Sequence, residues 1–313
     1  FGSTALPLIS AFVASLIIAR WMGPRVAGLT NWTMALATIL LIPAKFGIEG
    51  ASSRLVSEYS VSRPRLVSAL IKAALVMRLT FTLPVSVATF LLAPLLAGFF
   101  NEEALTPLFR TASLLVFAVS LNELVALIVV GLKRFRSLFL MRAGMLILKT
   151  GLVGAVAVYA LGPDAVILVY TASALLPAAL MYIALSKYAA RTFPQGGSRH
   201  EVRGRLLRLS APLAVSGASV TIYSLLDKLM IGYYQGASPV GIYSIARNLL
   251  ETSLFPTFAL VMTLRPMLAG YWAGGERERC RELVRGSLLS SFFYASAVIL
   301  VFSCLSGPLV TGL

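Results

Sequence analysis

The chain has 313 residues, of which 58% are hydrophobic and 12% charged, and its formal net charge is +15. A soluble domain of this size would carry about 25% charged residues, and apolar runs long enough to cross a bilayer recur along the whole sequence. This excludes a soluble protein, and it favours basic loops that orient a membrane protein, instead of nucleic-acid binding, as the reason for the positive charge.

Nine apolar runs follow one another along the chain. Only helices or closed barrels satisfy the backbone in lipid, and runs this long and continuous favour helices. The predicted spans are 3–20, 29–47, 69–99, 107–131, 139–161, 165–187, 206–232, 240–266 and 286–311. Pro84 and Pro94 could kink the long third span or end it early. We therefore expect an all-α, polytopic helical membrane protein.

The loops between these spans alternate in character. One set is short and nearly free of lysine: 21–28, 100–106, 162–164 and 233–239. The other set is basic and holds Arg54, Arg63, Arg65, Lys72, Lys133, Arg134, Arg136, Arg142, Lys187, Arg191, Arg199, Arg203, Arg205, Arg208, Arg265, Arg277, Arg279, Arg281 and Arg285. By the positive-inside rule, the basic loops and the N-terminus lie on the cytoplasmic side of the cell membrane.

The basic loops have a second interpretation as binding sites for anionic lipid headgroups. The 48–68 and 270–285 loops also contain amphipathic pieces that could lie on the membrane surface.

Two parts of the sequence resemble each other when one is shifted by 213 residues. The superimposed pairs are Gly23 with Gly236, Gly28 with Gly241, and Pro43 with Pro256, and Tyr59 and Tyr271 fall within one residue of register. Glycine permits a tight turn and proline fixes a bend, so the matches have structural meaning. The shift spans six helices, and an even number gives both copies the same orientation. This predicts parallel repeats related by an axis along the membrane normal.

The repeat predicts the domain organisation. Residues 1–190 form a first lobe with helices one to six, 191–205 form a basic cytoplasmic linker, and 206–313 form the first part of a second lobe with helices seven to nine. The second lobe is expected to be incomplete, with at least three further helices after Leu313 and a few residues before Phe1 in a complete two-lobed protein.

Several motifs resemble the prokaryotic oligosaccharide and polysaccharide flippases, the polysaccharide biosynthesis export proteins of the multidrug/oligosaccharidyl-lipid/polysaccharide exporter superfamily. The stretch from Ala19 to Gly28, ARWMGPRVAG, resembles that family's A-R-x-L-G-P-x-x-Y-G signature, with Ala27 and Met22 as departures. Further matching residues are Phe46-Gly47-Ile48-Glu49, Arg54, Glu58-Tyr59, Asp227, Met230-Ile231-Gly232, Val240-Gly241-Ile242-Tyr243, Ala246-Arg247 and Leu264-Arg265-Pro266.

The resemblance implies a two-lobed bundle that moves a glycan on a polyprenyl phosphate or pyrophosphate across the membrane by alternating access. Such a headgroup requires a water-filled cavity lined by cations. In the similar lipid II flippase an arginine of helix eight faces this cavity, and Arg247 matches that position. The candidate cavity cations are Arg247, Arg78, Lys149, Lys45, Arg20 and Arg25. Arg20, Arg25 and Lys228 lie near span ends, where they could instead extend to the membrane interface.

Three acidic residues inside spans are candidates for coupling to Na⁺ or H⁺: Asp227, Glu251 and Glu123. Two of them have simpler interpretations. Glu251 follows Arg247 by four residues, so the two could pair on one helix face, and Asp227 could belong to a structural ion pair. No metal-ligand cluster and no cofactor motif is present in the sequence.

A flippase for a lipid-linked oligosaccharide, acting as a monomer, is the leading hypothesis. The alternative is a multidrug or metabolite cation-coupled antiporter, which would need an acidic or apolar cavity, whereas intramembrane bases outnumber acids here. A glycan ligase or polymerase would need a large outer loop, and every predicted outer loop is short. A non-transporting scaffold has no feature in its favour. We therefore expect a transporter, not an enzyme.

Overall fold

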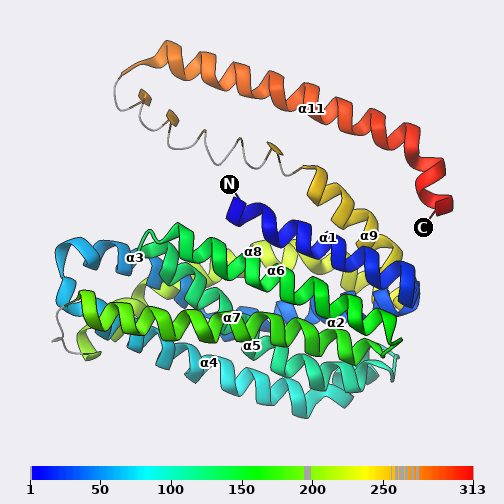
Figure 1. The fold of residues 1–313 in the computed structure, drawn as a ribbon, viewed down its shortest axis with the longest axis horizontal. Coiled ribbons are helices and arrows are strands. Elements are labelled where there is room, and N and C mark those ends of the chain that lie inside the picture. The colour runs from blue at the N-terminus through cyan, green and yellow to red at the C-terminus, as the bar shows by residue number, and fades with distance from the viewer. Residues whose placement is uncertain are drawn as a thin grey trace.

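The computed structural model describes residues 2–193, 199–254 and 275–312, together with a few positions between 256 and 272. The helices up to residue 253 lie side by side in a bundle, the helix at 277–312 runs apart from it, and the described residues contain no strand (Figure 1). The predicted all-α fold is therefore confirmed.

The described helices are α1 (Gly2–Met22), α2 (Pro24–Lys45), α3 (Ile48–Ser62), α4 (Pro64–Phe99), α5 (Leu105–Gly131), α6 (Phe135–Val158), α7 (Pro163–Thr192), α8 (Arg199–Gln235), α9 (Ala237–Ser253) and α11 (Arg277–Gly312). Three of them begin at a proline, Pro24, Pro64 or Pro163. Proline suits this position because its fixed φ is helical and its missing N–H would have no partner there.

Seven of the described helices are long and apolar enough to cross a membrane: α2, α4, α5, α6, α7, residues 202–235 of α8 and residues 277–304 of α11. The other two predicted spans coincide with α1, whose described apolar part is Ser10–Met22, and with α9, which has 17 residues. The predicted span 240–266 extends past α9 into residues that are largely outside the described ones, including Arg265 and Pro266.

The prolines of α4 do not end the helix, contrary to one expectation from the sequence. Helix α4 continues through both Pro84 and Pro94 to Phe99, so neither proline ends the span. In a membrane helix the backbone groups freed by proline can find other partners within the protein. The amphipathic piece at 48–62 is α3, and one face of it packs against the bundle, because Ile48, Leu55 and Val56 are fully buried while Arg54 and Glu58 are exposed. Its expected position at the membrane surface stays a prediction.

The break between α2 and α3 shapes the interior of the bundle. Phe46 and Gly47 both adopt left-handed backbone conformations, with φ of 46° and 66°. Phe46 is held there by stacking on Phe81 of α4, with 4.8 Å between ring centroids. Only glycine fits at position 47, because a methyl group there would lie 2.4 Å from the Ser210 carbonyl oxygen of α8. The break leaves the carbonyls at the end of α2 available to other partners.

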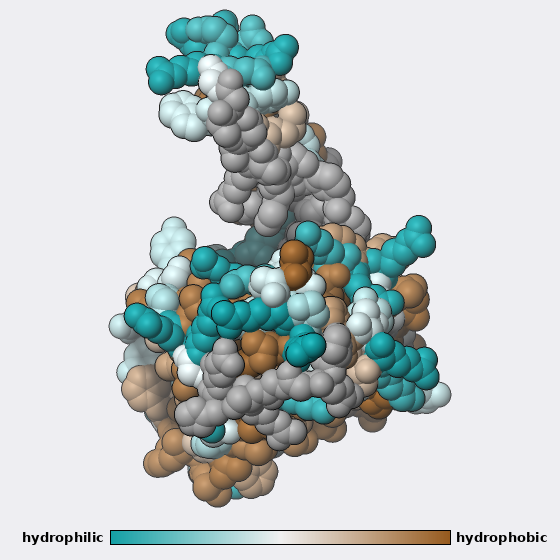
Figure 2. All heavy atoms as spheres, turned by 90° about the vertical axis from the view of Figure 1, so that its left-hand side faces the viewer, coloured by the Kyte–Doolittle hydropathy of each residue, from teal (hydrophilic) through white to brown (hydrophobic). Residues whose placement is uncertain are grey.

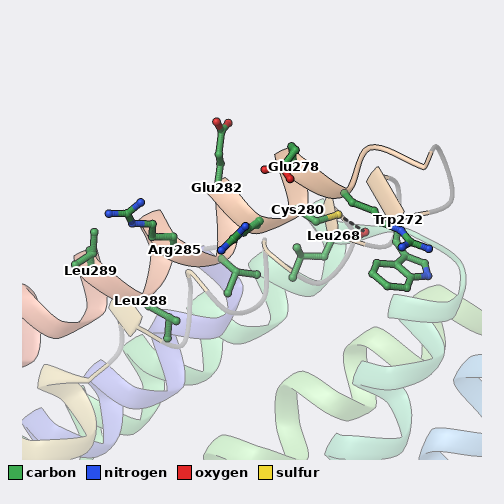
Figure 3. A pocket seen from close by; sticks show the side chains of 11 residues that line it. Leu268, Trp272, Glu278, Cys280, Glu282, Arg285, Leu288 and Leu289 are labelled. Atoms are coloured by element: carbon green, nitrogen blue, oxygen red, sulfur yellow. Dashed lines mark hydrogen bonds between the residues drawn. The ribbon is translucent and has the colours of Figure 1, made fainter.

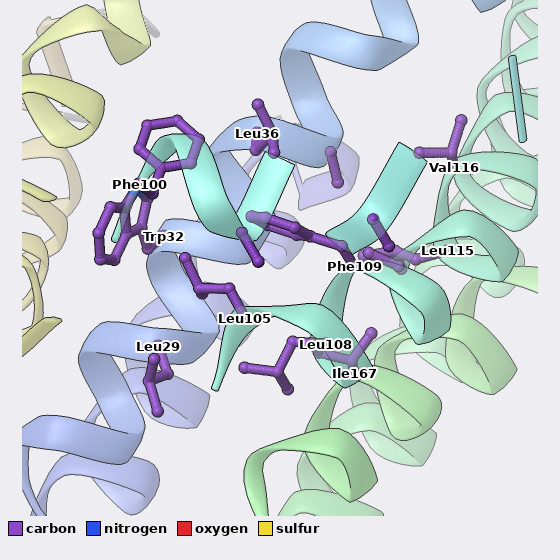
Figure 4. Close-up of a cluster of buried hydrophobic side chains, with 14 of the residues drawn as sticks. Leu29, Trp32, Leu36, Phe100, Leu105, Leu108, Phe109, Leu115, Val116 and Ile167 are labelled. Carbon is purple, nitrogen blue, oxygen red and sulfur yellow. The ribbon is translucent and has the colours of Figure 1, made fainter. Parts of the chain in front are cut away.

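One of the two main buried clusters lies where α2, α4 and α5 meet. Trp32, Phe100 and Phe109 form its aromatic centre, with Trp32 and Phe100 packed edge to face at 5.2 Å (Figure 4). Leu105 and Leu108 of α5 fill the space beside them and are almost fully buried. This cluster fixes the first helices as one packed unit.

Apolar side chains also cover the outside of the long helices. Leu91 and Leu95 of α4, Ile147 of α6 and Leu180 of α7 are each more than 60% exposed. Exposed apolar faces of this extent are what a lipid-facing surface requires. An end-on view from the α3 side shows hydrophilic side chains gathered on that end of the bundle (Figure 2).

The two predicted repeats share a local structure. Gly23 and Gly236 precede α2 and α9 with nearly the same φ, 87° and 85°. A methyl group on Gly28 would lie 1.7 Å from the Ala237 carbonyl oxygen, and one on Gly241 would lie 2.3 Å from the Pro24 carbonyl oxygen. Pro24 and Ala237 are themselves related by the 213-residue shift, so α2 and α9 cross with approximate two-fold symmetry. We name this contact the glycine crossing (Pro24, Gly28, Ala237 and Gly241).

Candidate functional site

The strongest cluster of charges in the second predicted lobe joins α8 to α9. Arg247 Nε donates to Glu251 Oε1 at 2.9 Å, and Arg247 also forms an ion pair with Asp227. The hydroxyl of Tyr243 donates to the same Asp227 carboxylate, and the Lys228 backbone N–H donates to its other oxygen at 2.8 Å. One arginine is thus held between two carboxylates.

The spacing of these residues explains the cluster. Tyr243, Arg247 and Glu251 are four residues apart on α9, so their side chains share one face. The turn at Gly236 folds α9 back along α8 and brings Asp227 beside that face. The sequence predicted the pairing of Arg247 with Glu251, but the contribution of Tyr243 depends on the fold.

This charge cluster lines an open hollow of about 570 Å³. Its lining residues are Tyr223, Asp227, Tyr243, Ala246, Arg247, Leu250 and Glu251. The Arg247 side chain is 20% exposed, against 35% for Asp227 and 45% for Glu251. The charged groups are therefore withdrawn from bulk solvent yet within reach of a ligand that enters the hollow.

A second group of charges lies at the end of α2. Lys45 forms an ion pair with Glu123 of α5, and Arg78 of α4 pairs with Glu49 of α3 at 2.5 Å. Arg78 and Thr82 also donate to the Ala44 carbonyl oxygen, at 3.5 and 3.2 Å. The Arg78 side chain is fully buried, so in this conformation it faces no cavity.

Lys45 and Glu49 do border a small hollow of about 80 Å³ between α2 and α8. The remaining lining residues are Thr38, Ile42, Gly47, Leu213, Ala214, Gly217, Ala218 and Thr221. This hollow lies between the two predicted lobes, where a transporter of this architecture would hold its cargo.

The other three candidate cations lie elsewhere. Lys149 of α6 rests over the Tyr170 ring of α7, with its Nζ 4.2 Å from the ring centroid. Arg20, at the end of α1, is exposed, and Arg25 is 68% exposed and 3.4 Å from Glu102. The six candidate cations are thus distributed over several places, and their assignment to one substrate cavity stays a prediction.

Several contacts between the predicted lobes were not foreseen from the sequence. Asn248 of α9 donates to Ser15 of α1 at 3.1 Å. Arg205 of α8 donates to Glu58 at 2.8 Å and to the Tyr59 hydroxyl at 3.2 Å. Glu58 and Tyr59 stood out as motif residues, but a partner almost 150 positions away leaves no local signal in one sequence.

A further hollow lies along the start of α11. It measures about 1360 Å³, and Trp272, Cys280, Arg281 and Arg285 are among its lining residues (Figure 3). Glu282 points away from it, and the Cys280 thiol approaches the Leu268 carbonyl oxygen at 3.9 Å. Positions between Leu268 and Arg277 are only partly described, so we assign no role to this hollow. The described residues hold no group of three His, Cys, Asp or Glu side chains suited to a metal ion.

Comparison with solved structures defines the class of protein. The chain resembles an inward-facing multidrug resistance MATE family transporter of the MOP superfamily, with a TM-score of 0.69, 16% sequence identity, and coverage of 97% of this chain and 70% of that one. It also resembles the MATE multidrug transporter DinF-BH, with a TM-score of 0.55, 16% identity, and coverage of 97% and 69%. The chain therefore shares the fold of these two membrane proteins.

The family follows from the sequence itself. The model of the polysaccharide biosynthesis protein family matches residues 3–272, and the chain belongs to this family. No curated protein matches the sequence. The expected family and fold are confirmed: the chain belongs to the polysaccharide biosynthesis protein family and has the fold of a multi-pass membrane protein.

Proposed function

We propose that this protein moves a polyprenyl phosphate- or pyrophosphate-linked oligosaccharide across the cytoplasmic membrane by alternating access, for the biosynthesis of a surface polysaccharide. Membership of the polysaccharide biosynthesis protein family supports the glycan. The observation that carries the proposal is Arg247, a partly buried arginine that lines a hollow on the α8–α9 face. Its guanidinium offers phosphate oxygens paired donors.

Substrate binding at Arg247 would be an exchange of partners. In this conformation Asp227 and Glu251 already accept the Arg247 donors. A phosphate that takes the Nε or Nη1 donors would replace at least one of these carboxylates, and a carboxylate left unpaired in a partly buried site is costly. Na⁺ binding or protonation at Asp227 or Glu251 would remove that cost, and this would couple an ion to cargo binding. Na⁺ and H⁺ remain alternative coupling ions.

The alternative, a multidrug or metabolite cation-coupled antiporter, has weaker support. A cationic cargo needs carboxylates that are available to it. Glu49, Glu123, Asp227 and Glu251 each form an ion pair with a cation of this chain. The hollows therefore offer no unpaired negative charge among these four residues.

Replacing Arg247 by alanine tests the proposal. In cells that depend on this protein for export, Arg247→Ala should abolish surface glycan while the amount of protein in the membrane stays normal, because the phosphate loses its paired donors. Arg208→Ala removes an exposed arginine of α8 outside the hollow and should leave export unchanged. Surface glycan at the wild-type level in Arg247→Ala would refute the assignment.

A further inference from the structure

A concave site lies between α4 and α7, away from both charge clusters described above. It measures about 290 Å³ and is lined by Ser68, Ile71, Lys72, Tyr182, Ser186, Lys187, Ala189 and Ala190. The lysines come from different helices and border the same hollow, Lys72 from α4 and Lys187 from α7. Ser68 and Tyr182 add hydroxyl groups.

Among the described residues, no carboxylate compensates the charge of this site. None of its lining residues is acidic, and α4 contains no acidic residue along its whole length. The only acidic residue of α7 is Asp164, in its first turn and therefore at the opposite end of the helix. Neither Lys72 nor Lys187 forms an ion pair with a carboxylate of the described residues.

The site lies close to the basic end of the bundle. Lys72 follows the start of α4 at Pro64 by eight residues, and Lys187 precedes the end of α7 at Thr192 by five. At 1.5 Å per residue both lie about 8–12 Å from the basic end of the bundle. One turn deeper on the same helix faces, Val76 and Ile183 are 57% and 50% exposed. The hollow thus has ammonium and hydroxyl groups toward the basic end and lipid-facing apolar side chains beneath.

We propose that this hollow binds the phosphate headgroup of an anionic phospholipid, with the acyl chains lying over Val76 and Ile183. Basic pockets between transmembrane helices are suited to such headgroups. Lysines that merely extend from a span end to water need no shared cavity and no second helix. Here two helices supply one cation each to the same hollow, so the bound phosphate joins α4 to α7. This inference does not depend on the proposed cargo, nor on which side of the membrane the basic end of the bundle lies.

The test is lipid binding to the purified full chain in neutral detergent. Native mass spectrometry with added phosphatidylglycerol should detect one tightly bound lipid per chain, and added phosphatidylcholine should not. The lipid should also raise the temperature of thermal unfolding, because it links two helices. Lys72→Gln combined with Lys187→Gln should weaken phosphatidylglycerol binding by about thirtyfold, since each lysine near the membrane surface contributes about fivefold.

Matched variants separate the site from general charge. Arg136→Gln with Arg203→Gln also removes two exposed positive charges from the basic end, and this variant should bind phosphatidylglycerol like the wild type. Lys72→Arg with Lys187→Arg keeps the charges and should retain binding. If the Arg136→Gln, Arg203→Gln variant loses as much phosphatidylglycerol binding as the lysine variant, the binding is nonspecific attraction to positive charge, and the proposed lipid site is wrong. Inorganic phosphate that binds at the hollow as tightly as phosphatidylglycerol would overturn its assignment to a lipid.

Discussion

Arg78 and Arg247 both lie inside helices of the bundle, but their surroundings give them different roles. Arg78 is fully enclosed, with Glu49 and the Ala44 carbonyl oxygen as its partners. Arg247 is partly exposed at a hollow, between two carboxylates that a ligand could replace. In this conformation Arg78 therefore contributes to stability by tying α3 and α4 to the end of α2, and Arg247 is the arginine that we propose for cargo binding.

Breaking the buried pair should destabilise the protein. Glu49→Gln leaves the Arg78 charge without its carboxylate, and removing one partner of a buried ion pair costs about 3 kcal/mol or more. Thermal or denaturant unfolding of the purified protein in detergent measures this loss. Glu102→Gln removes the carboxylate of the exposed Arg25 pair and should cost less than about 1 kcal/mol. Equal losses in the two variants would show that Arg78 is not enclosed as described.

At the scale of elements, the glycine crossing is the contact that closes α2 against α9. The atoms that approach Gly28 and Gly241 are backbone carbonyl oxygens, which cannot turn aside as a side chain can. Trp32 adds to the closure, because it is fully buried and a methyl group on Gly232 of α8 would lie 2.3 Å from its ring. Alternating access would require this contact to separate.

A methyl group at the crossing should weaken it. Gly28→Ala overpacks a helix contact, which costs about 1–3 kcal/mol, and it should favour conformations in which α2 and α9 are apart. The readout is thiol labelling of Val240→Cys, since Val240 is fully buried, in a background without Cys280 and Cys304. Labelling should become several-fold faster with Gly28→Ala.

The control for the crossing is another helical glycine. Gly154→Ala adds the same methyl group where no atom lies within 4 Å, so it should leave Val240→Cys labelling unchanged. If Val240→Cys is labelled no faster with Gly28→Ala than with Gly154→Ala, the glycine crossing does not govern access to this end of the bundle.

At the scale of the whole molecule, the distribution of basic residues predicts which end lies in the cytoplasm. The turn between α5 and α6 holds Lys133 and Arg134, and the adjoining ends of α7 and α8 hold Lys187, Arg191, Arg199, Arg203 and Arg205, whereas Gly236 between α8 and α9 is uncharged. The two sets of turns lie at opposite ends of the bundle (Figure 1). Orientation stays a prediction from the positive-inside rule.

Thiol labelling from outside the cell tests the orientation. In a background without Cys280 and Cys304, an impermeant reagent should label Gln235→Cys in intact cells and should label Arg136→Cys only after the membrane is opened. Gly196→Cys, in the predicted linker and outside the described residues, should behave like Arg136→Cys. Labelling of Gln235→Cys and Arg136→Cys from the same side would overturn the topology.

Much of the architecture could be predicted because it depends on local pattern. Apolar runs of bilayer length predicted the helices, and matching glycines predicted the equivalent turns before α2 and α9. The lobe boundaries at 190 and 206 stay a prediction, although α7 continues to Thr192 and α8 begins at Arg199, so the predicted linker 191–205 is largely helical where it is described.

The candidate site was less predictable from the sequence. A four-residue spacing is enough to pair Arg247 with Glu251, because one helix turn fixes that distance. Other features depend on helices that are distant in the sequence. These features are the pairing of Arg78 with Glu49, the contact of Lys149 with Tyr170, and the position of α3.

The sequence by itself determined the fold class, most of the helices and the family, since bilayer thickness and helix period act over short stretches of chain, and it predicted the repeat. Only the tertiary structure decided which charges pair, that the repeated glycines pack against each other, and that Lys72 and Lys187 border one hollow. The physical reason is that burial and ion pairing belong to contacts between helices, and a single sequence does not encode these contacts locally.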